Sequence, residues 1–316
     1  MCLRALSAAV AALVFCSACA TDIHPTALPA VAASRIGELW ERPAAISTGD
    51  LLNGPWGADH APDASDTYTF VSKKRHGANP GLTVSDSHGR EWHIKQGVEA
   101  QPEVVLSHVL SAVGYHQPPV YFLPSFTLIG KGGRHTEQGG RFRLHDSALK
   151  NRGEWSWDQN PFVGTPAYQG LLVMLVLFNS ADLKNENNTL YEVKTREQGP
   201  TTWFVVRDLG SSLGEVGRFN PKENKPDVFE THGFITGVND GYVEFAYHAV
   251  HGGLVRHRIR PADVVWATRL LSELTDRQWQ DAFQGAGYTP EVANQFIRRI
   301  HQKIADGERL AAESGA

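Results

Sequence analysis

Residues 180–191 read SADLKNENNTLY, and the spacing of the polar residues in this stretch guides the interpretation of the whole chain. Asp182 is followed by Lys184 two residues later and by Asn187 five residues later. A solvated surface loop can have the same composition, and so can the catalytic loop of a phosphoryl-transfer enzyme. The neighbouring sequence has to decide between these two readings.

The sequence directly before this stretch predicts a buried helix. TPAYQGLLVMLVLFNS (165–180) is apolar nearly all the way round, as expected of a helix in the core. Thr165 is a suitable N-cap, and Pro166 fits the first turn. Polar residues that follow a core helix at once favour a catalytic loop over a surface loop.

A second short motif follows a predicted strand. VVRDLGSSLG (205–214) places Asp208 directly after an apolar run and just before Leu209-Gly210. Carboxylate and amide oxygens are the protein ligands that Mg²⁺ prefers, so Asp208 and Asn187 are candidate metal ligands, with Asn188 as an alternative to Asn187. Each motif is weak alone, but the two in this order support each other.

The preceding part of the chain is rich in short strands. Alternating and β-branched runs predict strands at 67–72, 82–86 and 91–95, and QPEVVLSHVLSAVGY (101–115) predicts a helix. Lys95 ends the third strand. A lysine at this point can be a solvated strand end or a phosphate ligand, and the acidic residues that follow it favour the second.

Two glutamates compete as the partner of Lys95. Glu103 lies within the predicted helix, which should begin at Pro102 and end at Gly114, and is the preferred partner. Glu99 precedes the helix and could bind Lys95 or a phosphate-bound metal instead. A carboxylate in a first helical turn can also serve only to complement the helix dipole.

The remaining sequence predicts an α+β fold. Strands are expected at 188–193 and 201–206, and helices dominate from residue 260 onward. Residues 130–164 are rich in Gly, Arg and Trp and give no clear pattern. A small β-rich half with one helix is therefore followed by a larger, mainly helical half.

In these motifs the chain resembles the protein-kinase-like fold over about residues 66 to 310, and it is more similar to atypical members such as the CotH, HipA-type and lipid kinases. The resemblance implies two lobes, ATP and Mg²⁺. It also implies roles for individual residues: Lys95 on the ATP phosphates with Glu103 or Glu99 beside it, Asp182 orienting the acceptor, Lys184 on the transferring phosphate, and Asn187 and Asp208 on Mg²⁺.

Several positions depart from the kinase pattern. Ser180-Ala181 replaces the usual His-Arg before the aspartate, so the catalytic loop must be braced by other residues. The phosphate-covering loop KKRHGANPG (73–81) contains only Gly77 and Gly81, and no A-P-E motif follows. We expect a phosphotransferase with an unidentified acceptor; a catalytically inactive kinase-fold binding lipoprotein is the alternative, and transfer of AMP would use the same residues.

The N-terminal segment has the layout of an export signal. A charged start, a short apolar run and the small residues CSACA (16–20) predict a leader over 1–20. Cys19 fits the lipidated cysteine of a bacterial lipobox, which would anchor the protein to a membrane facing the periplasm or the cell surface. Ala18-Cys19-Ala20 also fits simple cleavage, which would release a secreted chain beginning near Thr21.

The expected organisation after the leader is a tether and lead-in over 21–65, a β-rich lobe over 66–128 and a helical lobe over 129–316. The net charge of -4 gives no reason to expect nucleic acid as a partner. The expected partners are a nucleotide, the acceptor and a membrane reached through the N-terminal lipid. His248, His251 and His257 have loosely zinc-like spacing, but no cysteine accompanies them and the chain contains no H-E-x-x-H, so a zinc site is not expected.

Overall fold

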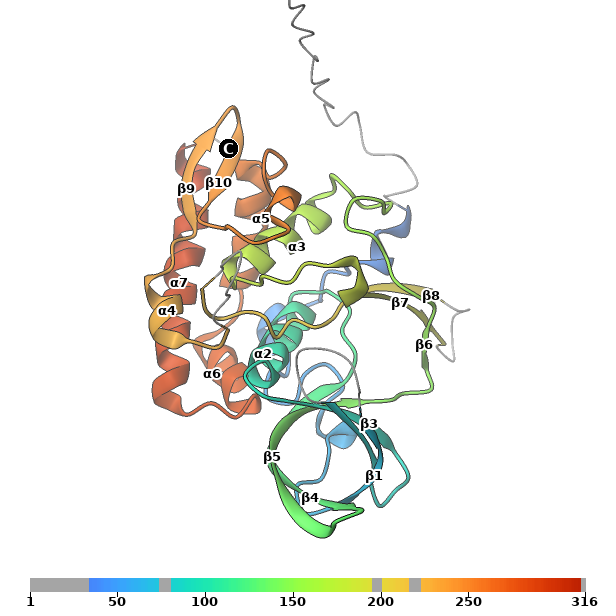
Figure 1. The fold of residues 1–316 in the computed structure, drawn as a ribbon. Helices are drawn as coiled ribbons and strands as arrows, with labels where there is room; N and C mark the ends of the chain where they lie inside the picture. Colours follow the sequence, from blue (N-terminus) through green and yellow to red (C-terminus); the bar gives the residue numbers. More distant parts are fainter. Residues whose placement is uncertain (1–33, 74–80, 195–200, 216–222, 314–316) are drawn as a thin grey trace, which may run out of the picture.

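The computed structural model describes residues 34–73, 81–194, 201–215 and 223–313. The predicted leader with Cys19 lies outside these residues, as does Gly77 of the predicted phosphate-covering loop. The described chain is a mixed α and β fold in which a closed barrel lies against helices and a small sheet (Figure 1). No helix in the described residues combines the length and the apolar character needed to cross a membrane.

Five strands close the barrel in the order β1-β2-β3-β5-β4. They are β1 (Thr67–Lys73), β2 (Gly81–Ser85), β3 (Glu91–Gln96), β4 (Val120–Gly130) and β5 (Gly133–Leu144). The β1–β4 pair is parallel and the others are antiparallel. Because side chains alternate along each strand, Tyr68, Trp92 and Phe142 fill the interior at 0% exposure. Lys95 and its cross-strand partner Arg141 face outward, away from this interior.

Helix α2 (Ala100–Ala112) connects the barrel to the helical part of the molecule, with contacts to β4 and β5 and to α6 (Asp276–Gly285). It begins two residues before the predicted start at Pro102. Pro102 is tolerated inside the first turn because the N–H groups there have no partner within the helix. Gly114 ends the helix as predicted, with φ of +109° and a Cβ position only 2.3 Å from the carbonyl oxygen of Glu41.

The expected lobe boundary at residue 128 is wrong, because the β-rich part continues to Leu144. Strand β5 pairs with both β3 and β4 and is needed to close the barrel. Its glycines hid it from sequence reasoning, yet they permit close strand contacts: a Cβ at Gly139 would lie 2.7 Å from the carbonyl oxygen of Pro124. The β-rich part also contributes two arginines, Arg141 and Arg143, to the site described below.

The expected tether over 21–65 is likewise corrected for its described portion. Leu39, Ile46 and Leu51 are 1–2% exposed and belong to the main hydrophobic core. The side chain of Gln278 donates hydrogen bonds to the carbonyl oxygens of Ile46 and Gly49. Ile46 lies in a short 3₁₀ turn, Leu39 directly follows another, and Leu51 lies outside any helix or strand, so no periodic sequence pattern revealed that they are buried.

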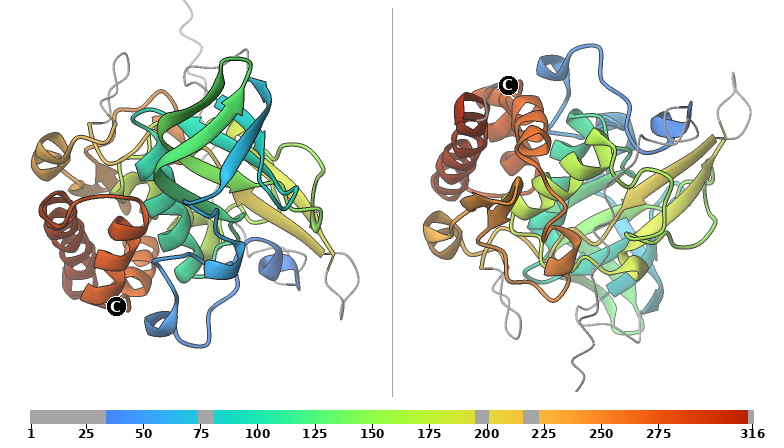
Figure 2. Two further views of the ribbon diagram at one scale, coloured as in Figure 1. Left: turned by 90° about the horizontal axis from the view of Figure 1, so that it is seen from below. Right: turned by 90° about the horizontal axis from the view of Figure 1, so that it is seen from above.

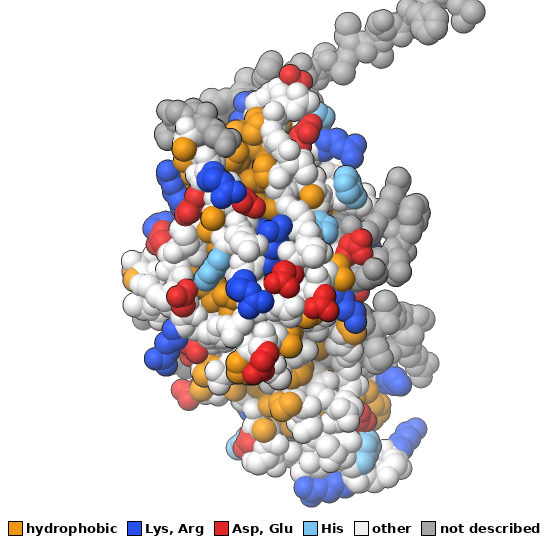
Figure 3. Space-filling model, turned by 90° about the vertical axis from the view of Figure 1, so that its left-hand side faces the viewer, with side chains coloured by type: hydrophobic (Ala, Val, Ile, Leu, Met, Phe, Trp, Pro, Cys, Tyr) orange, Lys and Arg blue, Asp and Glu red, His pale blue; other side chains and the backbone are white. Residues whose placement is uncertain are grey.

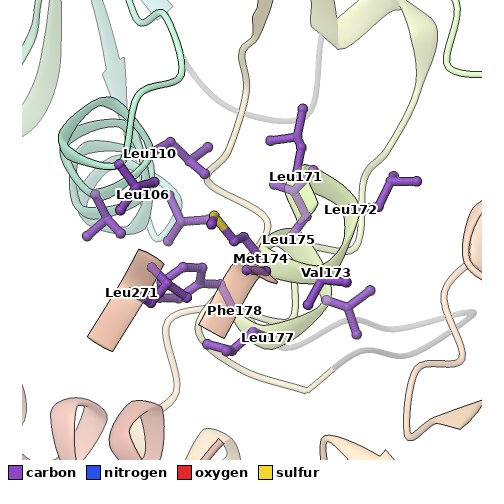
Figure 4. Packing of buried hydrophobic residues seen from close by; sticks show 14 of the residues in the cluster. Leu106, Leu110, Leu171, Leu172, Val173, Met174, Leu175, Leu177, Phe178 and Leu271 are labelled. Carbon is purple, nitrogen blue, oxygen red and sulfur yellow. The ribbon is translucent and has the colours of Figure 1, made fainter. Parts of the chain in front are cut away.

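Helix α3 (Pro166–Leu177) is the centre of the core, as its all-round apolar surface predicts. Its side chains pack against Leu106 and Leu110 of α2 and against Leu271 of α5 (Pro261–Ser272; Figure 4). Thr165 caps the helix, since its hydroxyl accepts a hydrogen bond from the backbone N–H of Tyr168 at 3.1 Å. This buried helix fixes the position of the stretch 180–187 that follows it.

The remaining elements lie on two sides of α3. One side carries the sheet β6 (Leu149–Asn151), β7 (Asn188–Val193) and β8 (Thr201–Val206). The other carries α4 (Pro226–Thr231), β9 (Ile235–Asn239), β10 (Tyr242–Phe245), α5 (Pro261–Ser272), α6 (Asp276–Gly285) and α7 (Pro290–Glu313). The C-terminal helices and the β7–β8 strands lie at opposite edges of the molecule (Figure 2). On the face seen in Figure 3, acidic and basic side chains are interspersed.

Candidate functional site

Lys95, at the end of β3, is the centre of the candidate site. Its Nζ lies 2.7 Å from Oε2 of Glu99, 3.2 Å from Oε2 of Glu103 and 3.0 Å from Oδ1 of Asp208. Both glutamates considered as partners therefore contact the lysine, and the aspartate of the second motif does so as well. The three carboxylates raise the pKa of Lys95 above its ordinary value, outweighing the opposing effect of burial.

Glu103 is a buried carboxylate shared by three cations. Its side chain is 3% exposed, and Oε1 lies 3.1 Å from Nε of Arg141 and 2.5 Å from Nη2 of Arg143. Burial would raise the pKa of Glu103, but Arg141, Lys95 and Arg143 together lower it well below its ordinary value. Burial and the neighbouring Arg143 lower the pKa of Arg141 to about 10. Glu103 thus ties Lys95 to strand β5.

The stretch 180–187 turns toward Lys95 and ends in a short 3₁₀ helix, Asn185–Asn187. The side-chain amide nitrogen of Asn187 donates to the carbonyl oxygen of Asp182 at 2.7 Å and to its Oδ2 at 3.1 Å. Nζ of Lys184 lies 2.9 Å from Oδ1 of Asp182. The three residues selected from their spacing are therefore close together in the structure.

The structure also separates Asn187 from its alternative, Asn188. Asn188 begins strand β7 and is 0% exposed, and its side chain donates to the carbonyl oxygen of Trp155 at 3.1 Å. Asn187 lines the site, with its amide nitrogen turned to Asp182. Its amide oxygen is then the atom that can bind a metal, so Asn187 is the better candidate ligand.

Asp208 occupies an unusual backbone position beyond strand β8. Its φ is +55°, a left-handed conformation that non-glycine residues rarely adopt and that is found preferentially at functional sites. Lys95 and Arg143 lower the pKa of Asp208 despite the opposing effects of burial and Glu103. Gly210 follows at a point where a Cβ would lie 2.5 Å from both Cβ and the carbonyl oxygen of Glu99, so only glycine fits.

The two candidate metal-binding residues are held together by the β7–β8 ladder. Asn188 of β7 pairs with Val206 of β8, and the backbone N–H of Arg207 donates to the carbonyl oxygen of Asn187 at 2.9 Å. Asn187 and Asp208 therefore extend from adjacent ends of two paired strands. Their relative position is set by backbone hydrogen bonds.

The residues that replace the missing His-Arg brace come from distant parts of the chain. The hydroxyl of Tyr247 donates to the carbonyl oxygen of Ser180. The backbone N–H of Ala181 donates to the carbonyl oxygen of Ser211 at 2.8 Å, which joins the two motifs directly. The expectation that bracing comes from elsewhere thus has a structural basis.

A buried lysine on α7 completes this bracing. Lys303 is 0% exposed, and its Nζ donates to the carbonyl oxygen of Leu177 at 2.8 Å and to Oδ1 of Asn179 at 2.9 Å. Nζ also lies 4.2 Å from the ring centre of Phe229, a cation–π contact. Burial lowers the pKa of Lys303 well below its ordinary value. The lysine fixes the turn that leads from α3 into the stretch 180–187.

A cavity of about 660 Å³ is lined by Lys95, Glu99, Asp182, Lys184, Asn187 and Asp208. Gly81 also lines it, at the start of β2, and Glu103 lies behind its wall. Sequence reasoning missed three arginines of the lining, Arg141, Arg143 and Arg207. The alternation in RFRL (141–144) is the sequence signal that could have predicted outward-facing basic residues on a strand.

The oxygen atoms in the cavity suit Mg²⁺. Asp182, Asn187 and Asp208 offer carboxylate and amide oxygens, which are hard ligands, and neither sulfur nor imidazole lies among these three. Lys95 and Lys184 supply cations of the kind that bind phosphate oxygens. The donor set therefore fits a divalent metal together with a phosphate-bearing ligand.

Comparison with known proteins gives limited similarity. No family model matches the chain, and no curated protein matches it. The kinase CtkA of Helicobacter pylori, described as proinflammatory, is similar in structure with a TM-score of 0.44 and 10% identity over 78% of this chain and 98% of that one. The MAP kinase LmaMPK10 of Leishmania major has a TM-score of 0.21 and 10% identity over 77% of this chain and 94% of that one.

Proposed function

We propose that the protein is a phosphotransferase with a two-lobed, kinase-like fold that uses ATP and Mg²⁺. One observation carries the proposal: Nζ of Lys95 lies within 3.2 Å of both Glu103 and Asp208, in a cavity that Asp182 and Asn187 also line. These five residues come from β3, α2, the stretch after α3 and the segment after β8. A purely structural ion pair would need only Lys95 of β3 and Glu103 of α2.

The proposed roles follow from charge and position. Lys95 binds phosphate oxygens of the nucleotide, and Glu103 and Glu99 hold the lysine in place. Asn187 and Asp208 hold Mg²⁺, which when bound neutralises charge on the phosphates. Gly77 and Gly81 belong to the loop that would cover the phosphates, although the loop is outside the described residues except at its ends.

Asp182 is the proposed base for the acceptor hydroxyl. The hydroxyl oxygen forms a bond to the transferred phosphorus, the bond between that phosphorus and the leaving ADP oxygen breaks, and the hydroxyl proton passes to the Asp182 carboxylate. Lys184, whose Nζ lies 2.9 Å from Oδ1 of Asp182, is placed to bind the transferring phosphate. Asn187 orients Asp182 through the 3.1 Å hydrogen bond between their side chains.

Melting temperature with ATP, with Mg²⁺ and with both tests the nucleotide site. We expect a clear rise only with both, because a ligand that binds the folded state stabilises it by about 2.7 kcal/mol at a concentration of 100 times its Kd. Asp208→Ala should abolish the rise, and Asp158→Ala, at an exposed aspartate paired with Arg258, should retain it.

Catalysis is tested separately from binding. Asp182→Asn should keep the rise in melting temperature with ATP and Mg²⁺ but lower the rate of ADP release at least about 100-fold, the usual contribution of a general base. If neither the protein nor its variants respond to ATP and Mg²⁺, the alternative of a catalytically inactive kinase-fold binding lipoprotein replaces this proposal.

We also propose that the protein acts after export, anchored through a lipid on Cys19. The order of charge, apolar run and small residues in 1–20 supports this proposal. Labelled palmitate should be incorporated into the protein in bacterial cells but not into its Cys19→Ser variant. Secretion of an unlabelled, cleaved chain would instead favour simple signal-peptide cleavage.

A further inference from the structure

A second cavity adjoins the candidate catalytic cavity. Its volume is about 420 Å³, and it shares His93, Arg143 and Arg207 with the first. These three residues therefore form the wall between the two cavities. The far side of the second cavity includes Tyr191 and His145. A ligand group held there would lie directly beside the phosphates and the acceptor of the proposed reaction.

Two arginines in the shared wall have hydrogen-bonding capacity that the protein does not use. The Nε atoms of Arg143 and Arg207 are buried and have no hydrogen-bond partner among the described residues. Nη2 of Arg143 binds Glu103, whereas within the described residues the guanidinium of Arg207 has one hydrogen bond, from Nη1 to the hydroxyl of Tyr191 at a long 3.4 Å. A buried N–H without an acceptor is costly, and a ligand that supplies the acceptor removes this cost.

The charges around the second cavity are strongly unequal. Its described lining carries the basic or titratable cationic side chains of His93, Arg143, His145, Lys150, Lys194 and Arg207. The one carboxylate in this lining, Asp146, accepts a hydrogen bond from the backbone N–H of Ala148 at 2.7 Å. Such a lining favours an anion, and the planar guanidinium groups suit phosphate oxygens in particular.

We propose that Arg143 and Arg207 bind a phosphate group that belongs to the acceptor, held in the second cavity. The substrate of the phosphotransferase is then a molecule that already carries a phosphate, and the wall arginines select it. Lys95 and Lys184 line the first cavity and serve the nucleotide, so the second cavity is left for the acceptor. This inference rests on the proposed function, but phosphate binding by the wall can be measured without turnover.

Calorimetric titration of the full-length protein with inorganic phosphate, without nucleotide or metal, tests the wall directly. We expect binding that weakens at least about 10-fold in Arg207→Gln and less in Arg207→Lys, which keeps the charge but loses the planar fork. Arg134→Gln, an exposed arginine near the β4–β5 turn, should bind phosphate like the original protein. Lys184→Met, in the first cavity only, reports whether phosphate binds in that cavity instead.

Three results would overturn the proposal. The original protein could fail to bind phosphate, Arg207→Gln could bind it unchanged, or Lys184→Met rather than Arg207→Gln could lose it, which would place phosphate in the first cavity.

A second titration with saturating ATP and Mg²⁺ identifies the source of the phosphate. Retained binding supports an acceptor group, whereas displacement would assign the wall to the nucleotide's own phosphates. Failure of ATP to bind, with phosphate binding intact, would reject the proposed function and the acceptor role, and would leave only the phosphate site formed by Arg143 and Arg207.

Discussion

Glu103 and Lys303 are both buried charged residues beside the candidate site, and the protein stabilises them in opposite ways. Glu103 is surrounded by the cations Lys95, Arg141 and Arg143. Lys303 contacts a carbonyl oxygen, an amide oxygen and the ring of Phe229, and it forms no ion pair with a carboxylate in the described part of the chain. The first charge is balanced by ion pairs, and the second by uncharged acceptors.

The two residues therefore have different roles in the protein. Glu103 holds Lys95, the proposed phosphate ligand, in a network of interacting charges, so a change in that network should alter the electrostatics of the cavity. Lys303 lies behind the turn at Asn179 and does not line the cavity. Its replacement should therefore alter the position of the stretch 180–187 more than the charge of the cavity.

Glu103→Gln should have the largest effect on stability. Removal of one partner from a buried ionic network leaves the other charges uncompensated and typically costs about 3–5 kcal/mol. Urea unfolding measures the change, and Glu137→Gln, a partly exposed carboxylate on β5 paired with His135, is the matched control. A cost below about 1 kcal/mol would show that the three cations do not depend on Glu103.

Lys303→Met should cost less than Glu103→Gln. The substitution leaves the carbonyl oxygen of Leu177 and Oδ1 of Asn179 without a donor, at about 1–3 kcal/mol for each buried group, but it also removes a charge that is costly to bury. We expect a net loss of about 1–2 kcal/mol and a lower rate of ADP release at unchanged ATP affinity. Gln302→Met, exposed on the same helix, should change neither. Weaker ATP binding in Lys303→Met would contradict a role confined to positioning.

The two charges should also affect stability in different pH ranges, although both raise stability as the pH increases. The pKa of Glu103 is lowered in the folded protein, so its network is fully stabilising above about 4.5 and loses its contribution as the pH falls below that value. The pKa of Lys303 is also lowered, so the unfolded chain binds more protons and stability rises as the pH increases toward 10.5. Urea unfolding across this range should show the alkaline rise in the original protein and not in Lys303→Met. An identical slope in both would remove Lys303 as its source.

Thr165→Ala should have the smallest effect on stability. It tests whether the rate of ADP release depends on the stability of α3 or on the position of the stretch that follows it. The N-cap of α3 lies at the opposite end of the helix from Leu177, and loss of its hydrogen bond should cost about 1 kcal/mol. We expect ADP release to remain unchanged below the melting temperature. A rate as low as that of Lys303→Met would mean that helix stability, rather than the brace at its end, controls the site.

The sequence predicted those parts of the site that lie in short local motifs. Each of these motifs lies within one loop or at one strand end, so its spacing can be recognised in the sequence. The structure brings their residues Asp182, Asn187 and Asp208 together with Lys95. The arginines of β5 were missed because Gly139 and Gly140 interrupt the strand pattern. Lys303 could not have been found, since its importance arises from a contact between residues 126 positions apart.

The core position of the lead-in was missed for a related reason. Leu39, Ile46 and Leu51 are spaced irregularly between prolines and glycines, so no periodic pattern marks them as buried. They are buried by residues distant in the chain, such as α6, whose Gln278 donates hydrogen bonds to the carbonyl oxygens of Ile46 and Gly49. Periodicity therefore predicted regular elements well and predicted irregular core segments poorly.

The β7–β8 ladder has a consequence for how related proteins can differ. Asn187 and Asp208 are positioned by the pairing of Asn188 with Val206, at the strand ends nearest the cavity. The connection between the two strands lies at the other end of the ladder. Insertions or deletions in that connection would change the number of residues between the two motifs without moving either side chain. A search for distant relatives should therefore allow the gap between the motifs to vary freely while keeping each motif and its strand intact.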